Sequence, residues 1–277
     1  MRIVKETVKI DPIFKDLDGI RILHIGDLHL RGRNKKIEAF LNKLSKESFD
    51  LLFITGDVVD DYRALDQTCA YLQKLRPRIG AWFVLGNHDE YKLNFKQLLF
   101  FRCVRSRTKK QDIEKLLSSL EKIGIRTLPN KTDRIKIGNV SLKITGITIP
   151  LGLDRLKPTN TIYKKDMENL EEFFSKDKGK KKEFSVVLTH LPDMVGAIKN
   201  MKADLYFAGH THGGQVRLPI IGPVFTFSRV QRRYNRGLFK ISDGSYMNVT
   251  AGIGHSRETP FRLFCPPEAT IITLKCQ

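Results

Sequence analysis

The stretch Ala203-Asp204-Leu205-Tyr206-Phe207-Ala208-Gly209-His210-Thr211-His212-Gly213-Gly214 joins an apolar run to two histidines that stand between glycines. The run predicts a buried strand, and residues two apart in an extended chain project to the same side. His210 and His212 can therefore both reach into one crevice, each as a potential metal ligand. Glycines on both sides allow the backbone to bend or to approach a ligand closely. In open α/β sheets, ligands bind at the carboxyl ends of strands, where this pair lies.

A His-x-His pair also occurs in ordinary loops, so the metal interpretation depends on the ends of the other predicted strands. These strands also end in aspartate, asparagine or histidine side chains, all of which suit metals. The strands and the residues that follow them are Arg21–Ile25 with Asp27 and His29, Asp50–Thr55 with Asp57 and Asp60, Ala81–Leu85 with Asn87, His88 and Asp89, and Phe184–Leu188 with His190.

Amphipathic helices are predicted between the first of these strands, because apolar residues recur there at helical spacing. One such set is Ile37, Phe40, Leu41 and Leu44, and another is Leu65, Cys69 and Leu72. Strand-then-helix units in a row predict an α/β fold with parallel pairing. Without an internal repeat or a linker, the chain is predicted to be a single domain over residues 1–277. Further strands are expected at Met1–Ile10, Val140–Ile147, Leu238–Ile241, Tyr246–Thr250 and Thr270–Leu274, and a further helix from Ile113 to Ile123.

The composition is that of a folded globular protein, with 41% hydrophobic and 29% charged residues. No stretch approaches the roughly twenty apolar residues of a membrane span, and Met1–Ile10 has no signal-peptide core, so a cytoplasmic location is expected. The four cysteines form no Cys-x-x-Cys pair, which argues against a thiolate zinc site and a disulfide framework. The net charge of +19 predicts attraction to phosphate groups, nucleic acid or an acidic membrane face.

Residues 91–110 interrupt the alternation of strands and helices with interleaved apolar and basic side chains. The apolar members include Phe95, Phe100 and Phe101. Such a segment could form an interfacial amphipathic helix on an anionic bilayer, on the inner face of the membrane. It could equally pack its apolar side on the domain. The basic members that could hold a phosphate-containing substrate are Lys92, Lys96, Arg102, Arg105 and Arg107.

The polar residues at the strand ends make an oxygen-and-imidazole set without sulfur, suited to manganese, iron or zinc. Single members have other interpretations: Asp57 could cap a helix, and Asn87 could serve a turn. Seven ligands suit two divalent ions that share one carboxylate and hold a bridging hydroxide for attack on a phosphoryl group. Next to Asn87, His88 could protonate a leaving oxygen while Asp89 orients it. The set is Asp27, His29, Asp57, Asn87, His190, His210 and His212.

In this order, Asp-x-His, Gly-Asp-x-x-Asp, Gly-Asn-His-Asp, a later His and Gly-His-Thr-His resemble the motifs of the calcineurin-like metallophosphoesterases. The resemblance extends from Asp27 to His212. It implies a four-layer αββα sandwich, in which helices flank two mixed sheets, with a dinuclear metal centre. By this match, one metal would be held by Asp27, His29, Asp57 and His212, and the other by Asp57, Asn87, His190 and His210. His88 would lie beside the phosphate, and Asp60 would support a ligand.

Three segments nearer the C-terminus, Gly213–Pro219, Gly252–Ser256 and Arg262–Glu268, resemble a bacterial subgroup of this superfamily. The subgroup includes membrane-associated phosphoesterases and the UDP-diacylglucosamine pyrophosphatases of lipid A synthesis. Two features depart from it. Many members carry a hydrophobic N-terminal anchor that this sequence lacks, and the acidic pair of some members is replaced here by Ile147-Thr148-Ile149-Pro150.

These observations predict a phosphohydrolase for a lipid-linked phosphate ester or pyrophosphate. The specific hypothesis is conversion of UDP-2,3-diacylglucosamine to a lipid monophosphate and UMP. One alternative is a nuclease or general phosphodiesterase, because the charge also suits a nucleic-acid backbone. Another is a non-catalytic protein-binding scaffold, which ranks last because every expected ligand and His88 are present.

Overall fold

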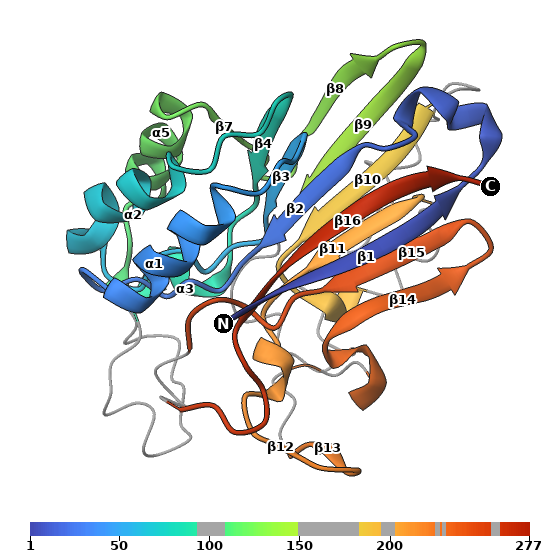
Figure 1. Ribbon diagram of the computed structural model, residues 1–277. Helices are drawn as coiled ribbons and strands as arrows, with labels where there is room; N and C mark the ends of the chain where they lie inside the picture. Colours follow the sequence, from blue (N-terminus) through green and yellow to red (C-terminus); the bar gives the residue numbers. More distant parts are fainter. Residues whose placement is uncertain (93–108, 149–182, 195–202, 225–227, 229–230, 256–260) are drawn as a thin grey trace, which may run out of the picture.

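The computed structural model describes residues 1–92, 109–148, 183–194, 203–224, 228, 231–255 and 261–277 (Figure 1). Two six-stranded sheets form its centre. The first sheet has the order β1 (Arg2–Ile10), β16 (Glu268–Cys276), β2 (Arg21–Ile25), β3 (Leu51–Ile54), β4 (Gly80–Phe83) and β7 (Ile125–Thr127). The second has the order β14 (Gly237–Ser242), β15 (Ser245–Val249), β11 (Leu205–Ala208), β10 (Glu183–Thr189), β9 (Val140–Ile147) and β8 (Thr132–Ile137).

Both sheets are mixed. In the first, β2, β3, β4 and β7 are parallel, while β16 runs antiparallel to β2. In the second, β9, β10, β11 and β15 are parallel, and β8 and β14 add antiparallel edges. The predicted α/β fold with two mixed sheets is therefore confirmed. Within each sheet, the carboxyl ends of the parallel strands lie together at one end of the sheet. The candidate site lies at this end.

Helices cover the outer face of the first sheet (Figure 1). They are α1 (Lys35–Leu44), α2 (Leu65–Leu72) and α5 (Ile113–Lys122). The start of α1 is fixed by Asn34, whose side chain accepts hydrogen bonds from the N–H groups of Lys36 and Ile37. The apolar side chains that predicted this helix are buried against the sheet. None of the helices in the described residues has the length and apolar character needed for a membrane span.

A second layer of buried apolar side chains lies between the two sheets. Phe53 of β3 lies edge-on to Phe207 of β11, with 5.0 Å between ring centroids, and at 5.8 Å from Trp82 of β4. Aromatic rings in such geometry add packing energy to the area that they bury. This layer fixes the position of one sheet relative to the other.

The segment 91–110 differs from the prediction at both of its ends. Tyr91–Lys92 (β5) pairs antiparallel with Lys109–Lys110 (β6), so these four residues are strand rather than helix. Residues 93–108 lie outside the described ranges, and with them Lys96, Arg102, Arg105 and Arg107. Sequence analysis also missed β7 and β8. Between Leu218 and Arg236, the described residues include strand β13 (Gly222–Pro223), which pairs with β12 (Arg217–Leu218), and the 3₁₀ helix η6 (Arg232–Asn235), none of which was predicted.

Candidate metal centre

The candidate ligands come from both sheets. Asp27 and His29 follow β2, Asp57 follows β3, and Asn87 begins the short helix α3 (Asn87–Glu90) after β4. From the second sheet, His190 follows β10 and His210 follows β11, and His212 begins the 3₁₀ helix η5 (His212–Gly214). The structure brings all seven predicted ligands to one place.

The backbone at this place is unusual. Asp27, His29, Asp57, His210 and His212 all have positive φ, between 49° and 69°. Non-glycine residues rarely adopt this conformation, and strained backbone of this kind clusters at functional sites. The neighbouring loops also approach closely, since a Cβ on Gly86 would collide with the carboxylate of Asp57. The chain therefore accepts local strain to aim these side chains inward.

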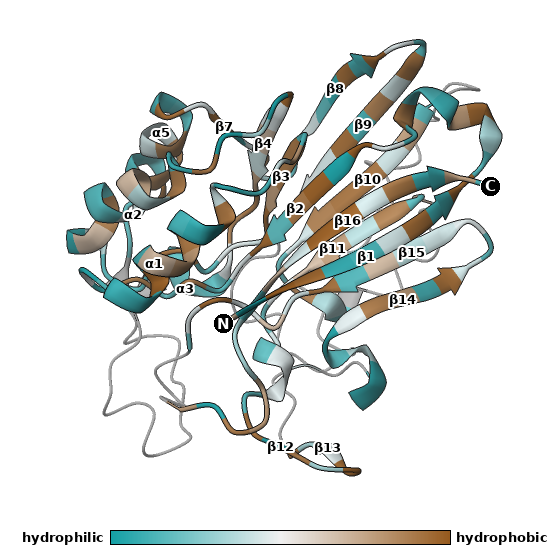
Figure 2. Ribbon diagram, in the orientation of Figure 1, coloured by the Kyte–Doolittle hydropathy of each residue, from teal (hydrophilic) through white to brown (hydrophobic). Residues whose placement is uncertain are grey.

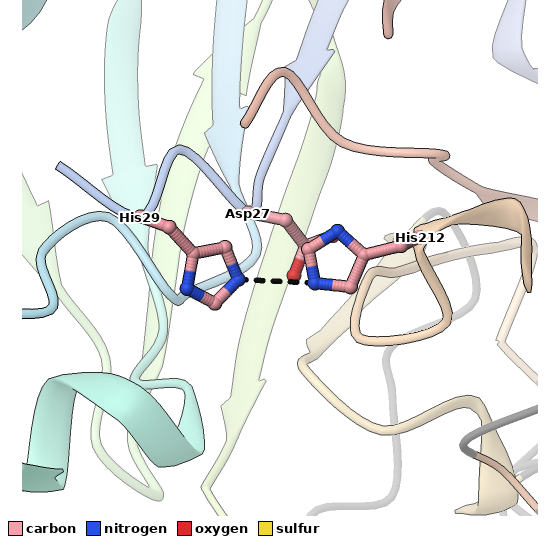
Figure 3. Close-up of side chains that lie close together, drawn as sticks. All are labelled: Asp27, His29 and His212. Atoms are coloured by element: carbon pink, nitrogen blue, oxygen red, sulfur yellow. Dashed lines mark hydrogen bonds between the residues drawn. The ribbon is translucent and has the colours of Figure 1, made fainter. Parts of the chain in front are cut away.

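One group of possible ligands consists of Asp27, His29 and His212 (Figure 3). Their nearest ligand atoms lie within 4.8 Å of one another, and all three residues are buried. Nε2 of His29 faces Nε2 of His212 at 3.0 Å. The backbone N–H of His210 donates to both carboxylate oxygens of Asp27, at 3.1 and 3.2 Å, and so fixes this carboxylate from the second sheet.

The second group consists of Asp57, His190 and His210, and the amide oxygen of Asn87 contacts both of its histidines. Nε2 of His190 lies 3.2 Å from Oδ2 of Asp57 and 3.0 Å from Oδ1 of Asn87. The same amide oxygen lies 3.0 Å from Nδ1 of His210. Oδ2 of Asp57 is also 3.6 Å from Nε2 of His29, so this carboxylate stands between the two groups.

The hydrogen bonds of two histidines, on the ring nitrogen that faces away from the site, show which nitrogen is left to bind a metal ion. Nδ1 of His29 lies 2.7 Å from Oδ1 of Asp60, and Nδ1 of His190 lies 2.6 Å from the carbonyl oxygen of Thr55. A carboxylate and a carbonyl only accept, so each Nδ1 carries a proton, and in the neutral ring each Nε2 presents a lone pair to the site. Partners of this kind orient histidine ligands in metal sites.

Several of these ring nitrogens face one another. Nε2 of His190 lies 3.2 Å from Nδ1 of His210, and the His29 and His212 nitrogens are closer still. Lone pairs at this distance repel unless a proton or a metal ion lies between them. Carboxylates buried beside them also need a cation. The donor set thus fits divalent metal ions held by nitrogen and oxygen ligands.

The electrostatics of the site are those of closely packed acids and bases. Burial, with a smaller effect from Asp57, raises the pKa of Asp27 to about 6. Burial opposes protonation of His190, but the carboxylates of Asp57 and Asp27 outweigh it and raise the pKa of His190 to about 9. Burial would likewise raise the pKa of Asp57, yet the neighbouring histidines hold it below its usual range. The site therefore favours ionised Asp57 together with positive charge around it.

The contacts of His88 correct one sequence-based expectation. Nδ1 of His88 lies 3.2 Å from Oδ1 of Asp60, so the carboxylate beside this ring is that of Asp60. Asp89, which was expected to orient His88, instead accepts four backbone N–H groups through its two carboxylate oxygens. The donors are Asp57, Val58, Val59 and Gly86, at 2.7 to 3.2 Å. Asp89 therefore shapes the loop that carries Asp57.

Sequence reasoning missed two arginines at the site. Nε of Arg31 donates to Oδ2 of Asp60 at 2.6 Å. Arg262 donates to the carbonyl oxygen of His212 at 3.3 Å and, through Nε, to that of Gly254 at 3.0 Å. Arg31 lies two residues after His29, which is a local signal, whereas Arg262 is fifty residues from its histidine and no spacing links the two.

Comparison with known proteins agrees with this geometry. Residues 20–214 match the family model described as calcineurin-like phosphoesterase. An uncharacterised metallophosphoesterase of Aquifex aeolicus (strain VF5) is 29% identical over 279 residues, which cover 99% of this chain and 92% of that protein. The UDP-2,3-diacylglucosamine pyrophosphatase LpxG of Chlamydia trachomatis serovar D is 27% identical over 304 residues, which cover 100% of this chain and 89% of that protein.

Among solved structures, phosphopantetheinyl hydrolase (PptH) from Mycobacterium tuberculosis matches with a TM-score of 0.50 and 16% identity. The match covers 87% of this chain and 92% of that one, and it shows a shared fold. The family model covers well over half of the sequence and includes every residue of the two ligand groups. This chain therefore belongs to the calcineurin-like phosphoesterase family and is a metal-dependent phosphohydrolase.

Proposed function

We propose that this protein hydrolyses the pyrophosphate bond of a lipid-linked nucleotide, UDP-2,3-diacylglucosamine, to UMP and a lipid monophosphate. The observation that carries the reaction type is the pair of ligand groups that meet at Asp57. The choice of substrate is supported by the similarity to LpxG and by the net charge of +19, which favours an anionic substrate.

In this proposal, the first group of ligands, with Asp57, holds one metal ion, and Asp57 holds a second with Asn87, His190 and His210. Two divalent ions held by these residues would polarise a phosphoryl oxygen and supply a nucleophile from water. Asp60 holds Nδ1 of His29 and the ring of His88, while Asp89 fixes the loop of Asp57. Manganese is the proposed metal, with iron and zinc as alternatives.

His88 is the proposed proton donor to the leaving oxygen. It lies at the start of α3, its backbone N–H donates to Oδ1 of Asp57 at 2.8 Å, and its ring is buried beside Asp60. We also propose that Lys92 and the basic residues Lys96, Arg102, Arg105 and Arg107 hold the diphosphate. Lys92 follows His88 by four positions in the chain, which is consistent with a role at the entrance to the site.

The test is product analysis on the purified protein with added manganese. UDP-2,3-diacylglucosamine, single-stranded DNA and a chromogenic phosphodiester are offered side by side. Release of UMP far faster than cleavage of the other two substrates supports the proposal. Preferred cleavage of DNA would make the protein a nuclease. Cleavage of only the chromogenic ester would reject the lipid substrate, and no cleavage of any substrate by metal-loaded protein would favour the scaffold alternative.

His88→Ala separates proton transfer from metal binding in the same assay. General acid catalysis contributes about 10²–10⁴-fold, so the variant should lose that much of its rate while it retains its metal. Metal content is measured on both proteins. An unchanged rate would remove His88 from the proposed role. Loss of metal as well as rate would show that His88 acts as a ligand or holds one in place.

A further inference from the structure

Exposed apolar side chains gather on the hairpin of β12 and β13, near the candidate metal centre. Ile220 in its turn is fully exposed, at 108%, and its neighbours Ile221 and Leu218 are exposed at 64% and 40%. Figure 2 shows the hairpin projecting below the two sheets, with apolar colouring at its tip. A turn in this position is usually polar, because it faces water.

The C-terminal segment 261–264 extends the same surface. Phe261, Leu263 and Phe264 are exposed at 60%, 43% and 65%. Leu263 bridges Val216 beside the hairpin, and its backbone bonds to Arg217 and Gln215 at 3.0 and 2.9 Å. We call Leu218, Ile220, Ile221, Phe261, Leu263 and Phe264 the apolar tip. They are six of the nine large hydrophobic residues that are exposed among the described residues, so the surface is concentrated rather than scattered.

The backbone of the hairpin turn is strained at its most exposed apolar residue. Ile220 has a φ of 70°, and the N–H of Ile221 donates to the carbonyl of Pro219 at 2.8 Å across it. This γ-turn with positive φ is rare, and a β-branched residue in it is an outlier. Glycine or asparagine would relieve the strain. An isoleucine that neither suits the backbone nor packs on the protein points to a role outside the molecule.

The apolar tip is fixed to the metal centre. The hairpin follows η5, which contains His212, and Nη1 of Arg217 donates to the carbonyl of Gly213 at 3.0 Å. Arg262, within the 261–264 segment, donates to the carbonyl of His212. The apolar tip therefore lies beside the loop that carries His210 and His212.

Positive charge lies beside the apolar tip. Helix η6 lies against β13 and carries the exposed side chains of Arg232 and Arg233, in a chain whose net charge is +19. Two copies of such a chain repel one another, which disfavours a dimer through this surface. An anionic bilayer attracts the arginines and accepts the apolar side chains below its headgroups.

We propose that the apolar tip inserts into the interface of an anionic lipid bilayer and holds the edge that carries the metal centre against the membrane. This contact differs from the segment 91–110 that the sequence suggested. The proposal concerns membrane binding and does not depend on the substrate. If the proposed function is right, the contact would let the enzyme act on a lipid-linked substrate that stays in the membrane.

The test is co-sedimentation of the full chain with vesicles of equal parts phosphatidylglycerol and phosphatidylcholine, and with phosphatidylcholine alone. The parent should bind the anionic vesicles more tightly. Ile220→Asn combined with Ile221→Ser should weaken this binding at least about tenfold, since one buried isoleucine contributes that much to an equilibrium constant. Asparagine tolerates the positive φ, so folding should be retained. The matched control is Ile13→Ser with Ile79→Ser, two isoleucines that are exposed outside the apolar tip.

A second variant, Arg232→Gln with Arg233→Gln, tests how much positive charge contributes to vesicle binding. It should weaken binding to anionic vesicles by about fivefold for each charge removed. Circular dichroism and turnover of a soluble chromogenic phosphodiester should be unchanged in both sets. The proposal is overturned if the Ile220/Ile221 variant binds vesicles as the parent does or if the parent binds no vesicles. It is also overturned if the parent is a dimer that this variant makes monomeric, because the occupant is then a second copy. If the protein hydrolyses the lipid-linked nucleotide but binds no vesicles, the membrane contact is rejected and the proposed function stands.

Discussion

Asp60→Asn tests whether the carboxylate behind His29 determines metal binding. Oδ1 of Asp60 accepts from Nδ1 of His29 at 2.7 Å, and Oδ2 accepts from Arg31 at 2.6 Å. Oδ1 also lies 3.2 Å from Nδ1 of His88, so an asparagine can keep its single oxygen either on the side of the two histidines or on the side of Arg31. If the oxygen stays with His29, the new NH₂ group faces the donor of Arg31. If the amide flips, its NH₂ group donates to Nδ1 of His29, which places the imidazole proton on Nε2, where a metal should bind.

The first of these two states costs less. Arg31 is partly exposed and can turn to solvent, whereas the side chain of His29 is 1% exposed and cannot. His29 then keeps its orientation but loses the negative charge that makes it a stronger ligand. Changes to such supporting partners lower metal affinity about 10–100-fold, or about 1.4–2.7 kcal/mol. We expect this loss at the site of Asp27, His29 and His212, and a smaller loss at the second site.

The assay is calorimetric titration of metal-free protein with manganese, with parent and variant compared at the same pH. Asp61→Asn is the matched control, since the Asp61 carboxylate bonds to the backbone N–H and guanidinium of Arg63. It should leave metal affinity unchanged within about twofold, even if it costs a helix cap. Affinity in Asp60→Asn equal to that of the parent would refute the reasoning that Asp60 sets the state of His29.

Three further predictions concern stability. In Asp89→Asn, two of the four backbone donors lose their acceptor. The free energy of unfolding of the metal-free protein, measured in urea, should therefore fall by about 2–4 kcal/mol, and a fall of less than about 1 kcal/mol would contradict this role. Burial raises the pKa of Asp204 to about 6, so the folded state retains a proton that the unfolded chain releases above about pH 4. The contribution of Asp204 to the free energy of unfolding therefore falls as the pH rises from about 4 to about 6. Asp204→Asn should raise the free energy of unfolding by about 1–3 kcal/mol at pH 7 and by little at pH 4. A gain that does not depend on pH would contradict this prediction. A chelator should lower the unfolding free energy of metal-loaded protein by about 2.7 kcal/mol when free metal had stood at 100 times its dissociation constant, and an unchanged melting curve would show that no metal binds the folded state.

The convergence of the candidate ligands was predictable because two simple signals coincide in this sequence. Short apolar runs mark buried strands, and a polar residue directly after such a run lies at a carboxyl end. Parallel pairing then brings these ends together within each sheet, as it does for Asp27 and Asp57 after β2 and β3, and for His190 and His210 after β10 and β11. The prediction needed no knowledge of side-chain rotamers.

Other features leave little trace in the sequence. The partners of Asp89 are backbone N–H groups, which nearly every residue has, so the sequence does not show which of them it binds. His88 was the only neighbouring side chain that the sequence offered as a partner for Asp89. Strand β8 is an edge strand in which no residue is fully buried, and β7 has three residues, so neither has the apolar run that reveals an inner strand. The positive φ of Ile220 arises from a turn in which neither residue type nor spacing signals the strain.

Because the candidate ligands are divided between two sheets, the apolar layer of Phe53, Trp82 and Phe207 sets the spacing within the candidate metal centre. Asp57 is carried by one sheet and His190 by the other, so the thickness of this layer sets the distance between them. A substitution that changes side-chain volume there would shift one half of the ligand set against the other without touching any ligand. The preference for larger or smaller ions can therefore be altered from deep inside the core, where a search for active-site variants would not look.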